Sequence, residues 1–292
     1  MKRYTQAEFD AFERDEKGVK YCPTGDYSQI ENFGRQCNFG KCCRFGKYCC
    51  FGALCNFGEC CSFGDRCSFG ECCSFGDRCC FEEWCSFGEC CDFGECCSFG
   101  ECCSFGKWCS FGEYCSFGEQ CIFGERCSFG ERCIFGECCR FGERCIFREE
   151  CIFREQCIFG KCCNFEVYCS FGKRCIFGER CSFGALCSFR ECCSFGKQCS
   201  FGEQCSFGDR CDFEGIGRAK PGYPFAAWIG SGSRKGSKTY FFNLEQGIYV
   251  RCGCFLGTLP EFREKVRETH GTDGLAGEYL AIADLVERKF AE

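Results

Sequence analysis

A six-residue period constrains this chain more than any other feature of its sequence. A phenylalanine recurs every six residues from Phe33 to Phe213 without an insertion, which gives 31 repeats. A cysteine stands two residues before the phenylalanine at every repeat from Cys37 to Cys211, 30 times in all. Written from the phenylalanine, the unit reads F-G-x-x-C-x. Such a period is typical of repeat architectures, in which each unit buries its apolar face against its neighbours.

The period also predicts which side chains face inward. Side chains two apart in a strand point to the same side, so each Cys shares a face with the Phe that follows it, and the residue between them faces outward. We therefore expect Cys and Phe to fill the interior. The glycine after each Phe can take the positive φ that a sharp corner requires, and the next two residues, mostly Glu, Arg, Gln and Lys, turn through solvent.

Three of these units close one triangular coil. The sequence thus predicts an all-β solenoid, a parallel β-helix of about ten coils that is roughly 50 Å long at a coil spacing of about 4.8 Å. Phe rings on one face would stack at that same spacing, which suits offset aromatic pairs. A quadrilateral helix needs a period of five, and the period here never leaves six.

The unit F-G-x-x-C-x resembles the hexapeptide repeat of left-handed parallel β-helices, in which a large apolar residue is followed by Gly and, four places on, by a small residue. This resemblance implies a left-handed coil, an exception to the right-handed rule for parallel crossovers. Phe departs from the usual Ile, Leu or Val at the large position, and Cys is then the small apolar filler that matches it.

The sequence predicts four segments. Residues 1–32 form an N-terminal cap, in which Thr5 and Glu8 make a capping box that opens a short helix. Residues 33–213 form the β-helix, 214–238 a linker, and 239–292 a small α+β domain. In that domain we expect a hairpin with its turn near Gly247, a helix that opens at the capping box of Thr258 and ends near His270, and a last helix over about 277–290.

A second resemblance lies outside the repeats. The segments "YCPTGDYSQIENFG", "GIYVRCGCFLGTLPEFREKVRETHG" and "GEYLAIADLVE" are similar to parts of uncharacterised proteins from gut bacteria and their phages. Together with the repeats, the resemblance covers nearly the whole chain. It implies a phage or mobile-element setting and no particular reaction.

Enzymatic activity is disfavoured by the scarcity of histidine. Hexapeptide-helix acyltransferases, and a zinc carbonic anhydrase of the same fold, depend on His residues on or between coils, whereas the single His of this chain is His270, in the tail. The repeat also has no inserted loop to build a substrate site. We therefore expect no catalytic residues and no cofactor, and read His270 as a residue of a helix C-terminus.

The cysteines invite a metal interpretation, which the pattern does not favour. An inward thiolate beside Phe would be costly, and an ion there would lack a second shell. Nine further Cys occupy the corner three places after Phe, where Cys42 stacks on Cys60 and Cys72 on Cys90, close enough for an occasional disulfide or a soft metal ion. We predict a packing role for the inward cysteines and no metal site.

Charge is the most informative feature of the exterior. Residues 59–155 carry a net charge of −10, against −6 for the whole chain. Residues three repeats apart stack on one corner, so the acids form two parallel rows that could bind a partner; the alternative is that they are solvated corner residues whose repulsion neighbouring Arg78, Arg126, Arg132 and Arg144 partly offset. The first row is Glu59, Asp77, Glu95, Glu113, Glu131 and Glu149, and the second is Asp65, Glu83, Glu101, Glu119, Glu137 and Glu155.

Isoleucine replaces the usual outward Ser along one length of the rod. An exposed apolar belt of this kind usually marks an interface, although Ile also simply favours strands. We expect it to join a homo-oligomer, a dimer or trimer. Its members are Ile122, Ile134, Ile146, Ile152, Ile158 and Ile176.

Three functions follow as hypotheses. The first is a non-catalytic interaction or structural rod of phage or mobile-element type that binds a host macromolecule. The second is a DNA mimic, which presents the acidic rows to a host DNA-binding protein, and the third is an acyltransferase-like enzyme. No apolar run is long enough to span a membrane and the N-terminus lacks the apolar core of a secretory signal, so we expect a cytoplasmic protein that binds neither membranes nor nucleic acid directly.

Overall fold

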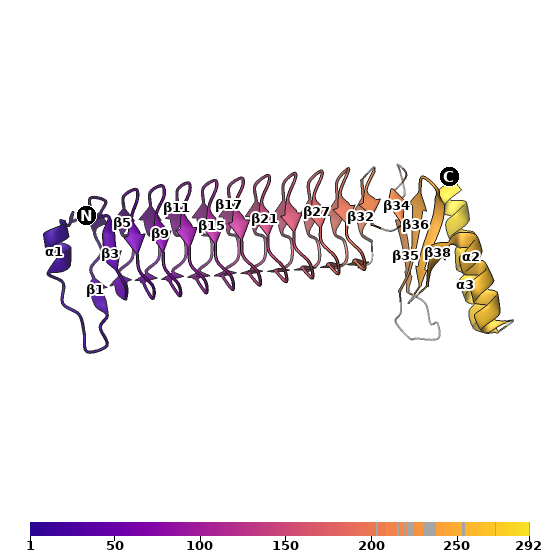
Figure 1. Cartoon of the computed structure of the whole chain (residues 1–292), viewed down its shortest axis with the longest axis horizontal. Helices are drawn as coiled ribbons and strands as arrows, with labels where there is room; N and C mark the ends of the chain where they lie inside the picture. The colour runs from indigo at the N-terminus through magenta and orange to yellow at the C-terminus, as the bar shows by residue number, and fades with distance from the viewer. Residues whose placement is uncertain are drawn as a thin grey trace.

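The structure is a computed structural model that describes residues 1–202, 204–208, 210–214, 216–218, 220, 225–229, 238–252, 255–271 and 273–291. It is a long rod with a short helix at its N-terminal end, and a sheet with two helices at its C-terminal end (Figure 1). The rod therefore makes up most of the chain, and the two ends close it.

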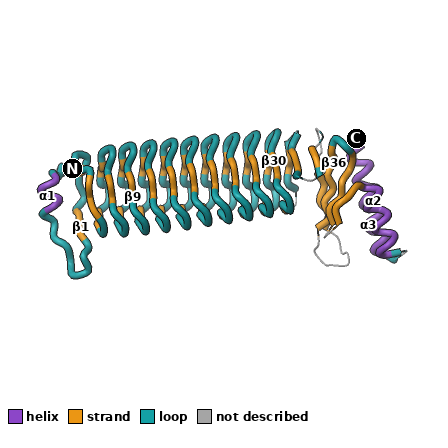
Figure 2. Tube along the Cα trace, in the orientation of Figure 1, coloured by secondary structure: helices purple, strands orange, loops and turns teal. Residues whose placement is uncertain are grey.

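The rod has three flat faces made of very short strands. After β4 (Cys37–Phe39), the strands β5 to β33 each consist of a repeat Phe and the residue before it, from Arg44–Phe45 to Asp212–Phe213. Every third strand pairs in parallel, so that residues three repeats apart are in register, as Phe111 is with Phe129. Face 1 runs from β1 through β4 to β31, face 2 from β2 through β5 to β32, and face 3 from β3 through β6 to β33. The turns between these strands carry the remaining residues of each repeat (Figure 2).

This arrangement confirms the predicted parallel β-solenoid, with about eleven turns of three strands each. The left hand of the coil stays a prediction from the repeat resemblance.

The first turn of the rod lies upstream of the predicted boundary at residue 33. It consists of β1 (Lys20–Cys22), β2 (Asp26–Tyr27) and β3 (Asn32–Gly34). Cys22 pairs with Phe39, and Tyr27 pairs with Phe45. The segment from Cys22 to Tyr27 is therefore one residue shorter than the segment from Phe39 to Phe45 in the next turn. Because this turn is one residue short and lacks the Cys and Phe pattern, the period alone did not reveal it.

The rest of the N-terminal segment closes the end of the rod. The helix α1 (Gln6–Asp10) opens at Thr5 with the predicted capping box to Glu8. Its Phe9 is buried and lies edge-on to Phe33, with 5.1 Å between the ring centroids. The first exposed layer of Phe rings is thereby covered, as a stacked solenoid requires.

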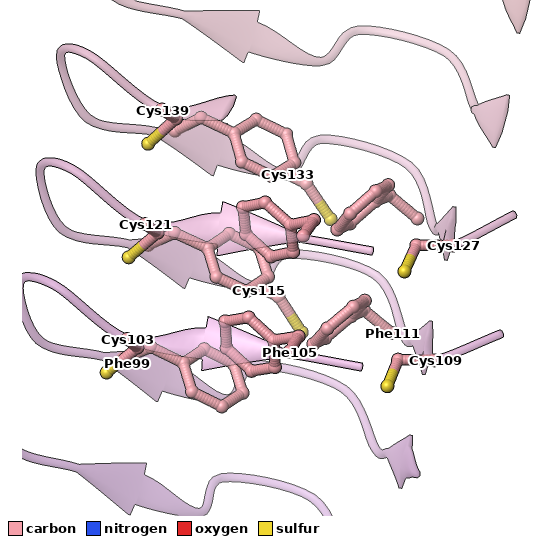
Figure 3. Packing of buried hydrophobic residues seen from close by; sticks show 14 of the residues in the cluster. Phe99, Cys103, Phe105, Cys109, Phe111, Cys115, Cys121, Cys127, Cys133 and Cys139 are labelled. Atoms are coloured by element: carbon pink, nitrogen blue, oxygen red, sulfur yellow. The ribbon is translucent and has the colours of Figure 1, made fainter. Parts of the chain in front are cut away.

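Phenylalanine and cysteine fill the interior, as predicted. The ring of Phe129 stacks on Phe111 and Phe147 of the neighbouring turns at 4.9 and 4.8 Å, within 2° of parallel. It also meets Phe123 of the adjacent face edge-on at 5.1 Å. Stacked and edge-to-face contacts are the two favourable arrangements of aromatic rings, and each ring in the rod makes both. The inward Cys side chains line up beside these stacks (Figure 3).

The predicted role of the repeat glycine is wrong except at Gly34, which has a φ of 73°. Positive φ occurs two positions later than expected, at the residue three places after Phe, as at Arg132 with φ of 56°. The backbone N–H of Arg132 donates a 2.9 Å hydrogen bond to the Glu149 carbonyl of the next turn, which holds this conformation. Gly130 is needed for another reason: a Cβ there would lie 2.6 Å from the carbonyl carbon of Gly112 in the turn below. Glycine therefore permits close stacking of the turns.

The requirement for glycine is not absolute. Glu or Arg stands at the same position in six repeats, and none of these residues has a positive φ. These residues are Glu82, Arg148, Arg154, Glu166, Arg190 and Glu214.

The C-terminal region is α+β, as predicted. An antiparallel sheet contains β35 (Phe225–Ile229), β36 (Lys238–Leu244), β37 (Gly247–Cys252) and β38 (Phe255–Thr258), and β36 and β37 form the expected hairpin. The helix α2 (Leu259–His270) opens at the capping box of Thr258, and α3 (Gly274–Ala291) follows.

The predicted linker over 214–238 is only partly a linker. It contains β34 (Gly217–Arg218), which pairs antiparallel with β33, and the edge strand β35, while most of its other residues lie outside the described part of the chain. Phe242 of β36 packs on Phe213 with 4.9 Å between ring centroids. The C-terminal sheet therefore covers the last Phe layer of the rod.

Candidate interaction surface

The three corners of the rod carry most of its charged residues. We call them edge 1, edge 2 and edge 3: the residues two and three places after each Phe that follow the strands of faces 1, 2 and 3. The first acidic row lies on edge 1 and the second on edge 2, each member one turn from the next because every strand pairs with the strand three repeats on. All twelve side chains are exposed or half-exposed. The structure thus brings each predicted row into one line.

Among the described residues, only the N-terminal member of each row has a basic partner. Lys41 bonds Glu59 at 2.9 Å, and Lys47 bonds Asp65 at 2.5 Å. For the other ten carboxylates, from Asp77 to Glu155, the described part of the chain provides no ion pair. Neighbouring carboxylates one turn apart, at about 4.8 Å, lie well inside the screening length of about 8 Å in physiological salt. Each row is therefore a line of charges that repel one another.

Edge 3 has a different pattern of charged residues on the same backbone. At its position two places after Phe, lysines interrupt the acids, and Lys107 bonds Glu125 at 3.4 Å while Lys161 bonds Glu179 at 3.4 Å. The fold therefore accepts alternating charge at a corner. Nothing in the backbone geometry requires the two unbroken acidic rows.

The arginines that were expected to offset the repulsion within the acidic rows do so only in part. Arg126 and Arg144 lie on edge 3, where Arg126 sits over the ring of Trp108 at 5.7 Å. Arg132 lies on edge 1, but it bonds Glu150 at 2.8 Å and the Tyr114 hydroxyl at 2.7 Å, and neither belongs to the row. The Arg132 guanidinium accordingly holds the pKa of Glu150 below its ordinary value.

A carboxyl pair that the sequence analysis missed lies beside the second row. Glu82 replaces a repeat glycine one turn above Gly64, and its side chain meets Asp65. A side-chain hydrogen bond to Asp65, followed by burial, raises the pKa of Glu82, while Lys47 lowers the pKa of Asp65. The break in the F-G pattern at Phe81 was the signal that could have pointed to it.

Large exposed aromatic side chains on the corners of the rod are the other feature that was missed. They stand three places after Phe, at the same positive-φ corner, and each is about half exposed. Tyr and Trp are among the side chains most often found at the centre of protein interfaces. Their departure from the polar corner residues was visible in the sequence. They are Tyr48 and Trp84 on edge 2, Trp108 on edge 3, and Tyr114 and Tyr168 on edge 1.

The isoleucine belt is divided among the three faces. Ile134 and Ile152 are neighbours on face 2, and Ile158 and Ile176 are neighbours on face 3. Ile122 lies on face 3 beyond Arg140, and Ile146 stands alone on face 1 between Ser128 and Asn164. Their exposed fractions run from 38 to 52%, so all six are accessible, but the structure gathers them as two pairs and two single residues.

The inward cysteines have the surroundings of packing residues. The thiol of Cys127 donates to the Gly106 carbonyl of the turn below at 3.4 Å, and the same contact recurs along the rod. A side-chain hydrogen bond between Cys103 and Cys121, followed by burial, raises the pKa of Cys103 to about 12. The described cysteines other than Cys211 are free thiols, and the described residues contain no group of three or more His, Cys, Asp or Glu that could hold a metal ion.

The C-terminal end has two further features. His270 is the last residue of α2, and its Nδ1 lies 3.6 Å from a carboxylate oxygen of Asp273. A cavity of about 470 Å³ between the last turn and the C-terminal sheet is lined mainly by apolar side chains, among them Phe213 and Phe242, with Lys197 and Arg251 as its basic residues. No helix among the described residues is long and apolar enough to cross a membrane.

Comparison of the chain with family models, with curated proteins and with solved structures finds no match. The surface must therefore be interpreted from its own residues.

Proposed function

We propose that the protein is a non-catalytic interaction rod that binds a basic macromolecule of its host through edges 1 and 2. The observation that carries the proposal is the contrast between edges: ten carboxylates on edges 1 and 2 have no basic partner in the described part of the chain, whereas lysines interrupt edge 3. Stability alone favours alternation, since like charges in neighbouring positions are destabilising. The acidic rows therefore serve a basic partner, which neutralises their charge when it binds.

The exposed aromatic residues support the same surface. Tyr114 stands beside Glu113 of the row on edge 1, Tyr168 stands one turn beyond the last member of that row, and Trp84 stands beside Glu83 on edge 2. An acidic row steers a basic partner and speeds its association, and aromatic side chains supply apolar contact area once it is bound. The resemblance of the flanking segments makes a phage or mobile-element protein, acting in the bacterial cytoplasm, the setting we propose.

A DNA mimic is a second candidate, and charge spacing favours it. Two rows with one carboxylate per turn each give roughly one negative charge per 2.4 Å of rod, at a turn spacing of about 4.8 Å. Double-stranded DNA carries one per about 1.7 Å. The partner would then be a host DNA-binding protein, and duplex DNA would compete with the rod for it.

Matched charge variants test the proposal. Glu95→Gln/Glu113→Gln/Glu131→Gln removes three charges from edge 1, and Glu71→Gln/Glu89→Gln/Glu143→Gln removes three from edge 3. In pull-downs from host lysate washed at graded salt, we expect the wild type and the edge 3 variant to retain the same partner to the same salt concentration. The edge 1 variant should release it at lower salt.

Equal release from both variants would contradict the proposal, because it would show that net charge alone governs binding. Addition of duplex DNA to the wild-type complex separates the two candidates. Displacement of the partner favours the DNA mimic, and retention favours a partner that does not bind DNA.

We also propose that the rod self-associates as a dimer or trimer through its isoleucine-bearing faces. The adjacent pairs Ile134–Ile152 and Ile158–Ile176 are exposed apolar patches on the two flat sheets that border edge 2, where Ile152 lies close to Glu137 and Glu155. Association through a face leaves the edges open to the partner.

A further inference from the structure

Two pairs of exposed cysteines face each other across consecutive turns of the rod. Cys42 and Cys60 occupy the same corner position on edge 1, with φ of 57° and 59°. Their N–H groups make the same bond to the next turn, from Cys42 to Glu59 and from Cys60 to Asp77, both at 2.8 Å. On edge 3, Cys72 and Cys90 repeat the arrangement, with φ of 54° and 57°. All four side chains are exposed.

This geometry suits a disulfide. Equivalent residues on paired strands lie about 4.8 Å apart, and a disulfide needs Cα atoms roughly 4.4 to 6.8 Å apart. The two thiols also influence each other, since partial desolvation and then the neighbouring Cys42 raise the pKa of Cys60. By contrast, the adjacent Cys43 and Cys61 point into the rod and are buried, so they cannot compete for the exposed thiols.

We propose that Cys42–Cys60 and Cys72–Cys90 are two surface dithiols that exchange with low-molecular-weight disulfides such as glutathione disulfide, each closing a bond across two turns. One thiolate attacks a sulfur of glutathione disulfide, the S–S bond breaks, and one glutathione leaves and takes up a proton. The second cysteine, as its thiolate, attacks the mixed disulfide and expels the second glutathione. The protein loses two protons and two electrons, and glutathione disulfide gains them as two thiols.

The surroundings predict that the two pairs differ in rate. Lys41, Glu59 and Arg78 lie beside Cys42 and Cys60. Arg78 acts to lower the pKa of Cys60 and Glu59 acts to raise it, while Lys41 bonds the Glu59 carboxylate at 2.9 Å. Glu71 and Glu89 flank the other pair, and both act to raise the pKa of Cys90. Glutathione disulfide is anionic and the thiolate is the attacking form, so Cys42–Cys60 should react first, and both rates should rise with pH.

The chain contains its own control. Cys96 on edge 1 and Cys162 on edge 3 are exposed at the same corner position. The residues one turn away from them are Arg78 and Tyr114, and Arg144 and Arg180, so neither cysteine has a thiol partner on its edge. They should stop at the mixed disulfide.

Peptide mapping by mass spectrometry tests the proposal on the folded, fully reduced protein exposed to glutathione disulfide. We expect Cys42–Cys60 and Cys72–Cys90 to be recovered as linked peptides without glutathione, and Cys96 and Cys162 to carry one glutathione each. In Cys42→Ser, which changes one exposed side chain, Cys60 should instead retain glutathione. Glutathione on both members of a pair in the wild type, or links from Cys42 to Cys43, would overturn the proposal.

Discussion

Inside the rod the same two side chains recur at every turn, whereas the three edges differ from one another in charge. Phe129 meets its neighbours in the same stacked and edge-on contacts as Phe111 does. On the outside, lysines interrupt the acids of edge 3, and edges 1 and 2 each carry six acids in succession. The uniform interior is explained by packing and carries no information about function. The differences between the edges do not follow from packing, so they are where function is to be sought.

The largest expected effect lies inside. Phe129→Ala removes a ring that stacks on two others and should lower the free energy of unfolding by about 3 to 5 kcal/mol, because a cavity remains. Glu131→Gln, two residues away on edge 1, should change it little or raise it, since one repelling charge is removed. Chemical denaturation measures both, and equal losses would mean that inside and outside have been assigned wrongly.

Thiol reactivity sharpens the same contrast. Inward residues such as Cys127 are buried, and their thiols donate to a carbonyl of the turn below, so these residues should resist a thiol reagent in the folded, reduced protein. Corner cysteines such as Cys96 should react quickly. Metal analysis should return less than one ion per chain, and several tightly bound ions would contradict the packing role of the inward Cys.

Association through a face is the next effect in size. Ile134→Ser/Ile152→Ser removes the adjacent apolar pair on face 2, and Ile146→Ser removes a single isoleucine on face 1. Light scattering should show an oligomeric wild type, a smaller mass for the double variant, and little change for the single one. A monomeric wild type would rule out association through the faces.

The smallest effects concern two carboxyl groups with opposite pKa shifts. Arg132 lowers the pKa of Glu150, so its contribution to stability is present above its ordinary pKa of 4.5 and is lost as the pH falls through the lower folded value. Asp65 raises the pKa of Glu82, so ionised Glu82 destabilises the fold at neutral pH, and this effect disappears as the pH falls.

Glu150→Gln should therefore lower the melting temperature slightly at pH 7, and Glu82→Gln should raise it. Both differences from the wild type should shrink as the pH approaches about 3. Circular dichroism melts at several pH values check the two signs, and shifts in the same direction would show that the local partners do not control these groups.

Much of the rod could be predicted from its period, because Phe129 and Cys127 recur with a spacing that a three-sided coil satisfies. The roles of Gly130 and Arg132 could not, since the crowding that excludes a Cβ at Gly130 comes from the turn below and is absent from local sequence. The first turn was not predicted because its segment from Cys22 to Tyr27 is one residue shorter than the equivalent segment of the next turn, which breaks the six-residue period.

For the surface, the acidic rows followed directly from the three-repeat spacing. Their partners did not, because the path of a long side chain such as Arg132, which bonds Glu150 and Tyr114, depends on contacts in three dimensions. The pairing of Glu82 with Asp65 has the same origin. Position on an edge was thus predictable, and the electrostatic environment of each residue was not.

The most direct test interrupts the acids of edge 1 with lysines, as lysines interrupt the acids of edge 3. Glu95→Lys/Glu131→Lys places lysines between acids, as Lys107 lies next to Glu125. The account predicts a higher free energy of unfolding than the wild type, a gain that decreases at high salt, together with loss of the partner in the pull-down. A variant that is less stable, or one that is more stable and still retains its partner, would contradict the claim that the acidic rows are kept for binding.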